Sequence, residues 1–556
     1  MDMSVNDFEI ADLPILGYFN RQRFPQFCPE DCANWYLIAN PNGKKKLAMY
    51  PSMGRKHVNY LGQNRLIFNA QPRAVFKSKI YAYYVVNNTI LRVDRFFNII
   101  EISGASLVTF TGNVFFTYLV VNEITFACFV DGQKLYVYRE DTGVFSIVTD
   151  PRAPTNPSYI VAFANRLVVS QANSAQFFLS VTNLGGLSFD PALCFSFGTG
   201  PGYTSLFAQE DYIIGQMAVL NNNLYIFTDI TTGIWQNTPS VFSGSGVIFP
   251  LKKNSTFSFD FGIASPLSLS VGFDMMAWEA QNSDGLVQFM WSTGQPPKNI
   301  TSKAVDVLLQ NNATLKAANP FLDDEVRGFL YSYENTIFYR VSLGSYVDTD
   351  IIDLNSDAFS LDYNFDAEEW ARVTELNGQR NKAEKSIYFA NRHLITVSGE
   401  NTVYEMAGIF YANEVRNPAV SDPQAADAYL VKPFRYVRVT PTISEDDYSE
   451  FETEYVQIDF VWGDQDFIKN IVEDETTYDT LLKPSITLYW SDDGGISFYS
   501  ADNREFSALG EYSWRMRWYQ LGCSRNRVYK LVCVSTAPIV ILGGVMNKRR
   551  ISGGAN

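Results

Sequence analysis

Histidine is almost absent from this chain, which has two, His57 and His393, among 556 residues. Because histidine is the commonest general base and metal ligand, this shortage restricts His-dependent catalysis, and a zinc site with three histidines is impossible. The six cysteines are too few for a disulfide scaffold, and Cys28 and Cys32 have no second pair nearby that would complete a zinc site. We therefore expect no metal, no cofactor and a reducing compartment.

Long apolar runs and positive charge are also scarce. The most apolar short stretch, residues 537–546, has about half the length that spans a bilayer, and no basic segment followed by an apolar one opens the chain. We expect no membrane-spanning segment and synthesis in a cytoplasm. The 44 Lys and Arg residues are outnumbered by 59 Asp and Glu residues, giving a net charge of −15. Such a chain is poorly suited to gripping DNA or an anionic membrane over its whole surface.

Aromatic residues, in contrast, are abundant: 42 Phe, 32 Tyr and 9 Trp. Aromatic and β-branched residues favour strands, and most of the chain alternates between apolar and polar positions. Helical periodicity is limited to residues 304–318 and 366–376, each of which could hold a short helix. The composition therefore indicates an all-β protein.

One strand–turn–strand pattern recurs along the middle of the chain, with a polar, often Asn-containing turn between two apolar runs. It covers residues 81–93, 124–138, 159–169, 217–227, 328–339 and 387–397, with a more divergent copy at 268–291. A spacing of roughly 40 to 60 residues is typical of β-propeller blades, although ordinary hairpins in stacked sandwiches are an alternative. We predict an N-terminal arm and strand segment (1–55), a β-propeller-like domain of six or seven blades (56–425) and a C-terminal β-rich, sandwich-like platform domain (426–556).

Charge is separated by sign within the last of these domains. Residues 441–480 contain thirteen acidic residues and one basic residue, whereas residues 511–556 contain eight basic residues and one acidic residue. Acidic runs are usually solvated loops, but opposite patches also suit head-to-tail assembly into a ring. A spacing of two predicts that Arg515 and Arg517 share one strand face, as do Arg525 and Arg527. The candidate residues for a subunit or adaptor interface, or for a lumen, are Glu445, Asp446, Asp447, Arg515, Arg517, Arg525, Arg527, Lys548, Arg549 and Arg550.

The segment from Ser491 to Phe498 resembles the Asp-box turn of sialidase-type propellers. Its Ser491, Asp493, Gly495 and Phe498 fit a structural role, because an Asp side chain caps such a turn and Gly supplies the positive φ. Two facing carboxylates would suffice for a glycosidase, and the many acidic residues offer chance candidates. Sialidase-like propellers, however, repeat this turn from blade to blade, and one full copy is present here. We expect that the chain is not an enzyme. The alternative is a propeller glycosidase or a carbohydrate-binding tail protein.

Both ends of the chain are similar to one known family. Near the C-terminus, the Asp-box-like hairpin precedes an Arg-x-Arg-x-x-x-Leu-Gly-x-x-Arg strand pair (515–525) and a final apolar strand (535–544). Near the N-terminus, residues 34–36 and 47–54 resemble the family's Asn-x-Tyr and Tyr-Pro-Gly opening, except that Ser52 and Met53 stand between Pro51 and Gly54. The family is that of the tail hub, or nozzle, proteins of short-tailed phages, also called packaged-DNA stabilisation proteins.

The resemblance implies a structural, non-enzymatic protein of the virion tail, assembled in the host cytoplasm. Six copies would form a ring below the portal–adaptor complex (the head-to-tail connector) and continue the channel for double-stranded DNA. Tail fibres or spikes would be further partners of this ring. Such a ring would retain the packaged genome and let it pass at ejection. A net-acidic wall fits this expectation, because it repels phosphate and keeps the moving DNA from sticking.

Overall fold

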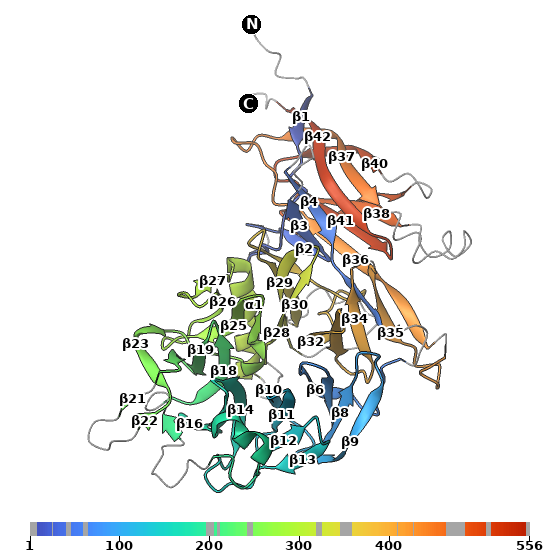
Figure 1. Cartoon of the computed structure of the whole chain (residues 1–556). Helices are drawn as coiled ribbons and strands as arrows, with labels where there is room; N and C mark the ends of the chain where they lie inside the picture. Colours follow the sequence, from blue (N-terminus) through green and yellow to red (C-terminus); the bar gives the residue numbers. More distant parts are fainter. Residues whose placement is uncertain are drawn as a thin grey trace.

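A computed structural model of the chain describes residues 8–24, 26–39, 46–58, 65–195, 205–207, 212–238, 240–241, 248–318, 325–344, 358–408, 410–425, 428–462, 484–506 and 513–551. Strands dominate these ranges. The chain is all-β, with a β-propeller joined to a β-sandwich-like domain (Figure 1). The one α-helix within these ranges, α1 (Lys303–Ala318), confirms the helix predicted over 304–318. Two short 3₁₀ turns, η1 (Thr182–Ser188) and η2 (Pro266–Ser268), interrupt the strands.

The first five propeller blades are separate four-stranded antiparallel sheets. Blade 1 contains β6 (Pro72–Lys77), β7 (Ala82–Val86), β8 (Thr89–Val93) and β9 (Ile99–Ser106). Blade 2 contains β10 (Phe115–Val121), β11 (Ile124–Val130), β12 (Leu135–Arg139) and β13 (Val144–Ile147). Blade 3 contains β14 (Pro157–Phe163), β15 (Arg166–Gln171), β16 (Gln176–Leu179) and β17 (Ser205–Phe207). Blade 4 contains β18 (Ile214–Leu220), β19 (Asn223–Thr228), β20 (Thr232–Gln236) and β23 (Lys252–Phe259), with the small hairpin β21 (Ser240–Val241) and β22 (Ile248–Phe249) before β23. Blade 5 contains β24 (Ser270–Gly272), β25 (Met275–Gln281), β26 (Val287–Ser292) and β27 (Lys298–Asn299).

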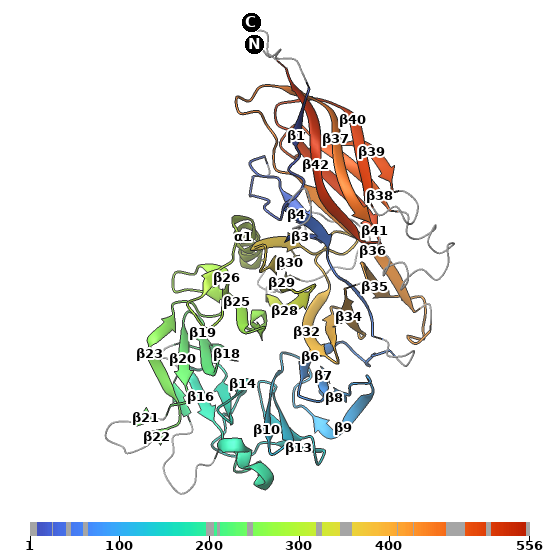
Figure 2. The same ribbon diagram turned by 45° about the horizontal axis from the view of Figure 1, so that its top comes forward.

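Two further four-stranded segments of a larger sheet complete the ring and make seven blades in the described part of the chain. Blade 6 contains β28 (Arg327–Tyr333), β29 (Thr336–Leu343), β30 (Phe359–Asn364) and β31 (Glu369–Arg372). Blade 7 contains β32 (Ala383–Phe389), β33 (Arg392–Val397), β34 (Val403–Ala407) and β5 (Gly54–His57). Because β5 comes from the start of the chain and β34 from its later part, their pairing closes the ring (Figures 1 and 2).

The recurring hairpins predicted from the sequence are confirmed as blade hairpins. In blades 1 and 2, residues 81–93 form the β7–β8 pair and residues 124–138 form the β11–β12 pair. The first two strands of blades 3, 4, 6 and 7 are formed by residues 159–169, 217–227, 328–339 and 387–397, respectively. The divergent copy at 268–291 contains the β25–β26 pair of blade 5. Their turns use residues in the left-handed region, such as Asn87 (φ 51°), Asn165 (φ 58°) and Asn391 (φ 60°). Asn tolerates this region and two-residue hairpin turns require it, which explains the recurring Asn.

The helix predicted over residues 366–376 is wrong. The Asn364 side chain accepts hydrogen bonds from the backbone N–H groups of Asp366 and Ala367, and Glu368 has a positive φ of 56°. This turn leads into β31, where Trp370 is buried and its Nε1–H donates to the Ile300 carbonyl (2.6 Å). The local Asx turn and the buried tryptophan therefore fix a hairpin in place of a helix.

The C-terminal domain consists of two facing sheets. One contains β37 (Phe451–Trp462), β40 (Ser513–Ser524) and β42 (Ile539–Arg550), and the other contains β36 (Tyr429–Val439), β41 (Val528–Ser535), β38 (Ser485–Ser491) and β39 (Tyr499–Glu505), with β35 (Ala412–Arg416) at the side of β36. Apolar side chains from both sheets pack together between them, including Trp518, Tyr436 and Ile541. This shared core defines a sandwich.

Four further strands of the N-terminal arm join the sheets of the two domains. β3 (Trp35–Ala39) and β4 (Leu47–Pro51) extend the sheet of β42, β1 (Glu9–Asp12) pairs with β42, and β2 (Asp31–Ala33) lies between β31 of blade 6 and β36. The strands of residues 1–55 are thus divided between propeller and sandwich. Within the described ranges, no helix has the length and apolar character needed to cross a membrane.

Candidate functional site: the charged ladder and the junction pocket

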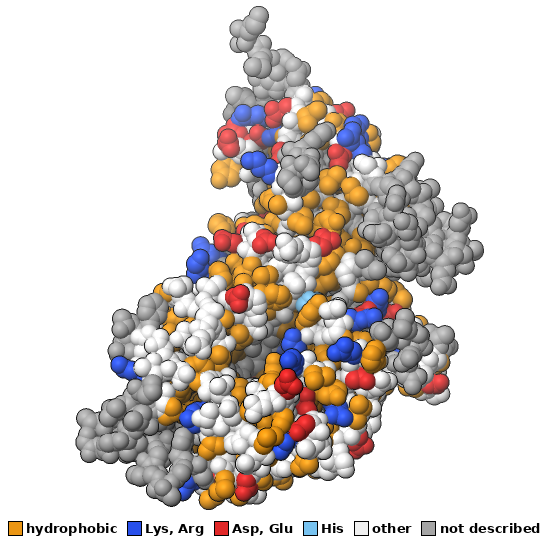
Figure 3. Space-filling model, viewed as in Figure 1, with side chains coloured by type: hydrophobic (Ala, Val, Ile, Leu, Met, Phe, Trp, Pro, Cys, Tyr) orange, Lys and Arg blue, Asp and Glu red, His pale blue; other side chains and the backbone are white. Residues whose placement is uncertain are grey.

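The acidic and basic segments of the C-terminal domain meet within the chain, where acidic residues of β37 and of the loop before it pair with basic residues of β40 and β42. Asp459 on β37 lies directly opposite Arg515 on β40, and their side chains form an ion pair with an Nε–Oδ1 distance of 2.9 Å. We call the set of such pairs the charged ladder. Its other pairs are Glu452 with Arg549, Asp447 with Arg550, and Glu445 with Lys548. Figure 3 shows acidic and basic side chains intermixed over this domain.

The ladder leaves several candidate residues open to solvent. The side chains of Arg515 and Arg550 are 54% and 50% exposed, and Asp446 is exposed in the loop before β37. Arg517 shares the outer face with Arg515, as predicted, and its Nε–H donates to Gln457 Oε1 (2.8 Å). Exposed ion pairs contribute about 0–1 kcal/mol each, so the pairs of Arg515 and Arg550 add little to stability and retain charge that a second molecule can contact.

The predicted common face of Arg525 and Arg527 is wrong. These residues lie in the turn between β40 and β41, where Arg525 is exposed and Arg527 is fully buried. The Arg527 guanidinium forms an ion pair with Asp492 (2.7 Å), and its Nη1–H donates to the Leu521 carbonyl (2.7 Å). Since a strand no longer runs through both positions, the alternation on which the prediction rested does not apply.

The segment from Ser491 to Phe498 forms the turn between β38 and β39. The Asp493 carboxylate accepts hydrogen bonds from the Ser491 hydroxyl (2.6 Å) and from the backbone N–H groups of Ile496 and Ser497 (3.0 Å each). Burial acts against ionisation, but these hydrogen bonds outweigh it and hold the pKa of Asp493 below its usual range. The segment therefore has a fixed shape that does not depend on a ligand.

Two glycines let this turn approach the N-terminal arm closely. Gly494 (φ 74°) and Gly495 (φ 90°) have left-handed conformations. A Cβ on Gly494 would lie 2.9 Å from Gln26 Cα, and a Cβ on Gly495 would lie 2.8 Å from Pro29 Cβ. Phe498 at the end of the turn packs against Ala33, Val437 and their neighbours. The Asp-box-like turn thus covers the sheet that connects the propeller to the sandwich.

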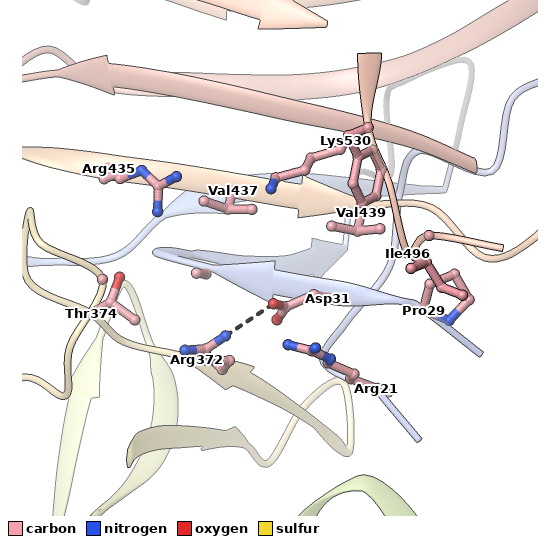
Figure 4. A pocket seen from close by; sticks show the side chains of 14 residues that line it. Arg21, Pro29, Asp31, Arg372, Thr374, Arg435, Val437, Val439, Ile496 and Lys530 are labelled. Carbon is pink, nitrogen blue, oxygen red and sulfur yellow. Dashed lines mark hydrogen bonds and ion pairs between the residues drawn. The ribbon is translucent and has the colours of Figure 1, made fainter. Parts of the chain in front are cut away.

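A pocket of about 210 Å³ lies between this turn, the N-terminal arm and blade 6; we call it the junction pocket. Arg21, Asp31, Arg372, Arg435 and Lys530 contribute charged side chains to it, and Figure 4 shows them around one space. None of these five residues was predicted as a site residue from the sequence. A possible signal was the alternation of residues 434–440, which places Arg435 on the same strand face as Val437 and Val439.

The two histidines lie apart from both features. His57 on β5 contacts Glu414 (Nδ1–Oε2 2.6 Å) and stacks on Tyr429, whereas His393 lies in blade 7 near Tyr388. Burial, together with the charge of Lys77, lowers the pKa of His393. Among the described residues, no group of three or more His, Cys, Asp or Glu side chains has the arrangement of a metal site.

The chain matches no protein-family model and no curated protein sequence. Among solved structures it is similar to the WD40 domain of Neurospora crassa Pan2, at 8% identity over 64% of this chain and 95% of that one, with a TM-score of 0.34. It is also similar to the β-propeller domain of Myceliophthora thermophila Cps50 (Swd1), at 8% identity over 64% and 99% of the two chains, with a TM-score of 0.36. The extracellular domain of a putative one-component system from B. thetaiotaomicron matches at 10% identity over 87% of this chain and 57% of its own, with a TM-score of 0.36. At these identities the likeness concerns the fold alone.

Proposed function

We propose that this chain is a structural subunit of a phage tail, which forms a hub or nozzle ring below the portal–adaptor complex. The ring, a hexamer, continues the DNA channel, retains the packaged genome and lets it pass at ejection. In this proposal the chain has no catalytic role. Its neighbours are further copies of itself, the adaptor ring, tail fibres or spikes, and the double-stranded DNA within the channel.

One observation carries this proposal: the two segments that resemble the tail hub family are far apart in sequence but adjacent in the fold. Met49 of β4 lies opposite Ile541 of β42, and the Trp35 Nε1–H donates to the Ile539 carbonyl (2.7 Å). The Trp35 ring also packs against Tyr436, at 4.9 Å between centroids. Two unrelated chance resemblances would have no reason to share one core, so their contact supports a single common domain.

The charged ladder supports an assembly role for this domain. Its basic residues lie on the long strands β40 and β42, its acidic residues lie on β37 and in the loop before it, and several of these side chains are open to solvent, as for Arg515 (54% exposed) and Asp447 (51% exposed). Exposed charges of both signs at fixed positions favour one partner and one register over others. Continuous strand ladders also resist deformation, which suits a ring around a pressurised channel.

The proposal is tested by mixing the purified chain with adaptor-bearing particles and imaging the product by negative-stain electron microscopy. We expect a six-fold ring on the particle axis, with a central passage lined by this chain. A chain that stays monomeric at high concentration, and fails to join such particles, would contradict the proposal.

A charge-swap series tests whether Arg515 contacts a neighbouring subunit. Arg515→Glu should reduce ring formation several-fold, while the free energy of unfolding of the monomer falls by about 1 kcal/mol or less, because an exposed ion pair is lost. Adding Asp459→Arg restores a pair within the chain but leaves a negative charge at position 515. We therefore expect the double variant to recover monomer stability without recovering the ring.

Arg504→Glu is the matched control, because Arg504 forms an exposed pair with Asp502 on β39, in the other sheet. It should leave the ring intact. Ring size is measured by light scattering after size-exclusion chromatography. Full recovery of the ring by the double variant would show that Arg515 acts only within its own chain, and would refute the interface assignment.

A further inference from the structure

We propose that the junction pocket binds a phosphate ion that still carries a proton, either as free inorganic phosphate or as the phosphate group of a small monoester. This inference does not depend on the proposed function. It is based on the charge of the pocket, the strand positions of its charged residues and one buried carboxylate oxygen.

The pocket has an excess of positive charge. Four cationic side chains line it, from Arg21, Arg372, Arg435 and Lys530, and Asp31 is the one acidic residue among the described lining residues. The Asp31 carboxylate pairs with Arg372 (Oδ2–Nη1 3.0 Å). In the described part of the chain, the side chains of the other three cations have no ion-pair partner. A small anion of charge −1 or −2 would offset part of this positive charge.

Four of the five charged side chains come from adjacent strands of one sheet and therefore have fixed positions. Arg372 is on β31, which pairs with β2, and β2 carries Asp31 and pairs in turn with β36, where Val439 lies opposite Asp31. Val439 in turn lies opposite Lys530 of β41. Arg435 is on the same face of β36, four residues before Val439, so the charged groups converge over one stretch of sheet (Figure 4).

Burial of these cations is costly without an anion. Arg435 and Lys530 are both half-buried. Burial, followed by the charge of Arg435, lowers the pKa of the Lys530 ammonium, and burial also lowers the pKa of Arg435. The Lys530 Nζ lies 5.0 Å from the centre of the Phe498 ring, so the Asp-box-like turn holds the ammonium over the pocket. An anion placed between these cations would remove their mutual repulsion.

The Asp31 carboxylate decides which anion fits. The residue is 8% exposed, and its Oδ1 accepts no hydrogen bond from any described residue. A buried acceptor without a donor costs free energy, so a ligand that brings an O–H group is favoured. Hydrogen phosphate has such a group, and Arg or Lys can bind its remaining oxygens. Sulfate and phosphodiesters carry no proton at neutral pH, so they would place an oxygen against Oδ1.

Isothermal titration calorimetry of the full chain near neutral pH, at constant ionic strength, tests this inference. We expect inorganic phosphate to bind with a submillimolar Kd and sulfate to bind at least about ten-fold more weakly. Arg435→Gln and Lys530→Met should each weaken phosphate binding by about ten-fold or more, because each removes a charge-assisted hydrogen bond. Arg504→Gln removes one positive charge from the same domain outside the pocket and should leave the Kd unchanged.

Asp31→Asn tests the selectivity separately from the affinity. The new amide can donate a hydrogen bond, so sulfate should bind more tightly and the preference for phosphate over sulfate should fall at least several-fold. Thermal unfolding without anion checks that each variant is folded. If Asp31→Asn does not fold, the phosphate Kd of Arg435→Gln still tests the inference. Phenyl phosphate identifies the source when it is compared with inorganic phosphate at about pH 5.5, below the second pKa of about 6 of a phosphate monoester, so that both ligands carry a proton. Tighter binding than inorganic phosphate then indicates a small organic monoester, and weaker binding indicates the free ion. Equal binding of phosphate and sulfate, absence of binding at millimolar phosphate, or an unchanged Kd in Arg435→Gln would overturn the inference.

Discussion

At the scale of single residues, Glu369 on β31 has an unusual electrostatic environment. Burial raises its pKa to about 7, and the negative charges of Glu30 and Glu368 act in the same direction. Because the pKa in the folded state lies above the ordinary value, this carboxyl does not destabilise the fold at a pH where it is protonated in both the folded and the unfolded state. The cost develops as the pH rises from the ordinary pKa of 4.5 toward 7, and above that it is fully present.

Glu369→Gln should therefore stabilise the protein in a pH-dependent way. Above pH 7 we expect the free energy of unfolding to rise by about 1 kcal/mol, a modest value because solvent screens a partly exposed group. Near the ordinary pKa the difference from the parent chain should vanish. Urea unfolding at a series of pH values measures it, with exposed Glu101→Gln as the control. A difference that is constant with pH would contradict the assigned cause.

Sequence reasoning was accurate for some residues and failed for others, for physical reasons. Alternation along β40 placed Arg515 and Arg517 on one face, because a strand has a period of two residues. It failed for Arg527, whose burial depends on Asp492, a residue in a different turn. The junction pocket was not anticipated either, since its charged groups come from the N-terminal arm, blade 6 and two sandwich strands.

At the scale of elements, the closing strand β5 depends on a glycine. A Cβ at Gly54 would lie 2.0 Å from the Ala412 carbonyl oxygen and 2.4 Å from that of Phe410. The Gly54 N–H donates to the same Phe410 carbonyl (2.7 Å). Arg55, next in the strand, forms a buried pair with Glu375 of the neighbouring blade segment. β5 is thus held by backbone contacts that exclude any side chain at its first position.

Gly54→Ala should lower the free energy of unfolding by about 3 kcal/mol or more, because the backbone atoms around the new methyl group cannot move aside easily. Gly272→Ala in β24 is the matched control, since a Cβ there meets no atom within 4 Å. It should be neutral or stabilise by up to about 1 kcal/mol through the unfolded state. Both are measured by guanidinium unfolding. Equal effects of the two substitutions would refute the assigned role of Gly54.

Local signals predicted most of the propeller hairpins, because each contains its own turn residues and its own alternation. The helix expected over 366–376 failed where an Asx turn and a buried Trp370 outweighed a weak helical pattern. The closing role of β5 left no local signal. Its pairing with β34 joins residues about 350 positions apart in sequence, and alternation does not reveal such a partner.

At the scale of the whole molecule, the N-terminal arm connects two domains that would otherwise contact each other mainly through β36. It supplies β5 to blade 7, β2 between blade 6 and the sandwich, and β1, β3 and β4 to the sheet of β42. Buried ion pairs tie the arm down further, such as Glu30 with Arg438 (2.7 Å). Folding of either domain therefore requires a segment that lies at the start of the chain.

Two fragments test this dependence. Residues 46–425 retain β5, whereas residues 65–425 lack it and leave blade 7 with three strands. We expect the longer fragment to unfold cooperatively and the shorter one to aggregate or to unfold at a clearly lower denaturant concentration, because β34 would lose its pairing with β5 and Glu375 would lose its buried partner Arg55. Circular dichroism and size-exclusion chromatography compare them. Identical unfolding curves would show that the propeller closes without the arm.

The pairing of β1 with β42 has a mechanical consequence. Glu9 lies opposite Lys548 and Asp12 opposite Val545, so the first and last described strands meet antiparallel, with the outward-leading end of each at the same edge. Tension applied to the two ends would load the hydrogen bonds between β1 and β42 one after another, so that β1 separates from β42 residue by residue. Strands in the opposite loading geometry would share the force and resist together. The tip of the sandwich is therefore the place where the fold yields first when the two ends of the chain are pulled apart.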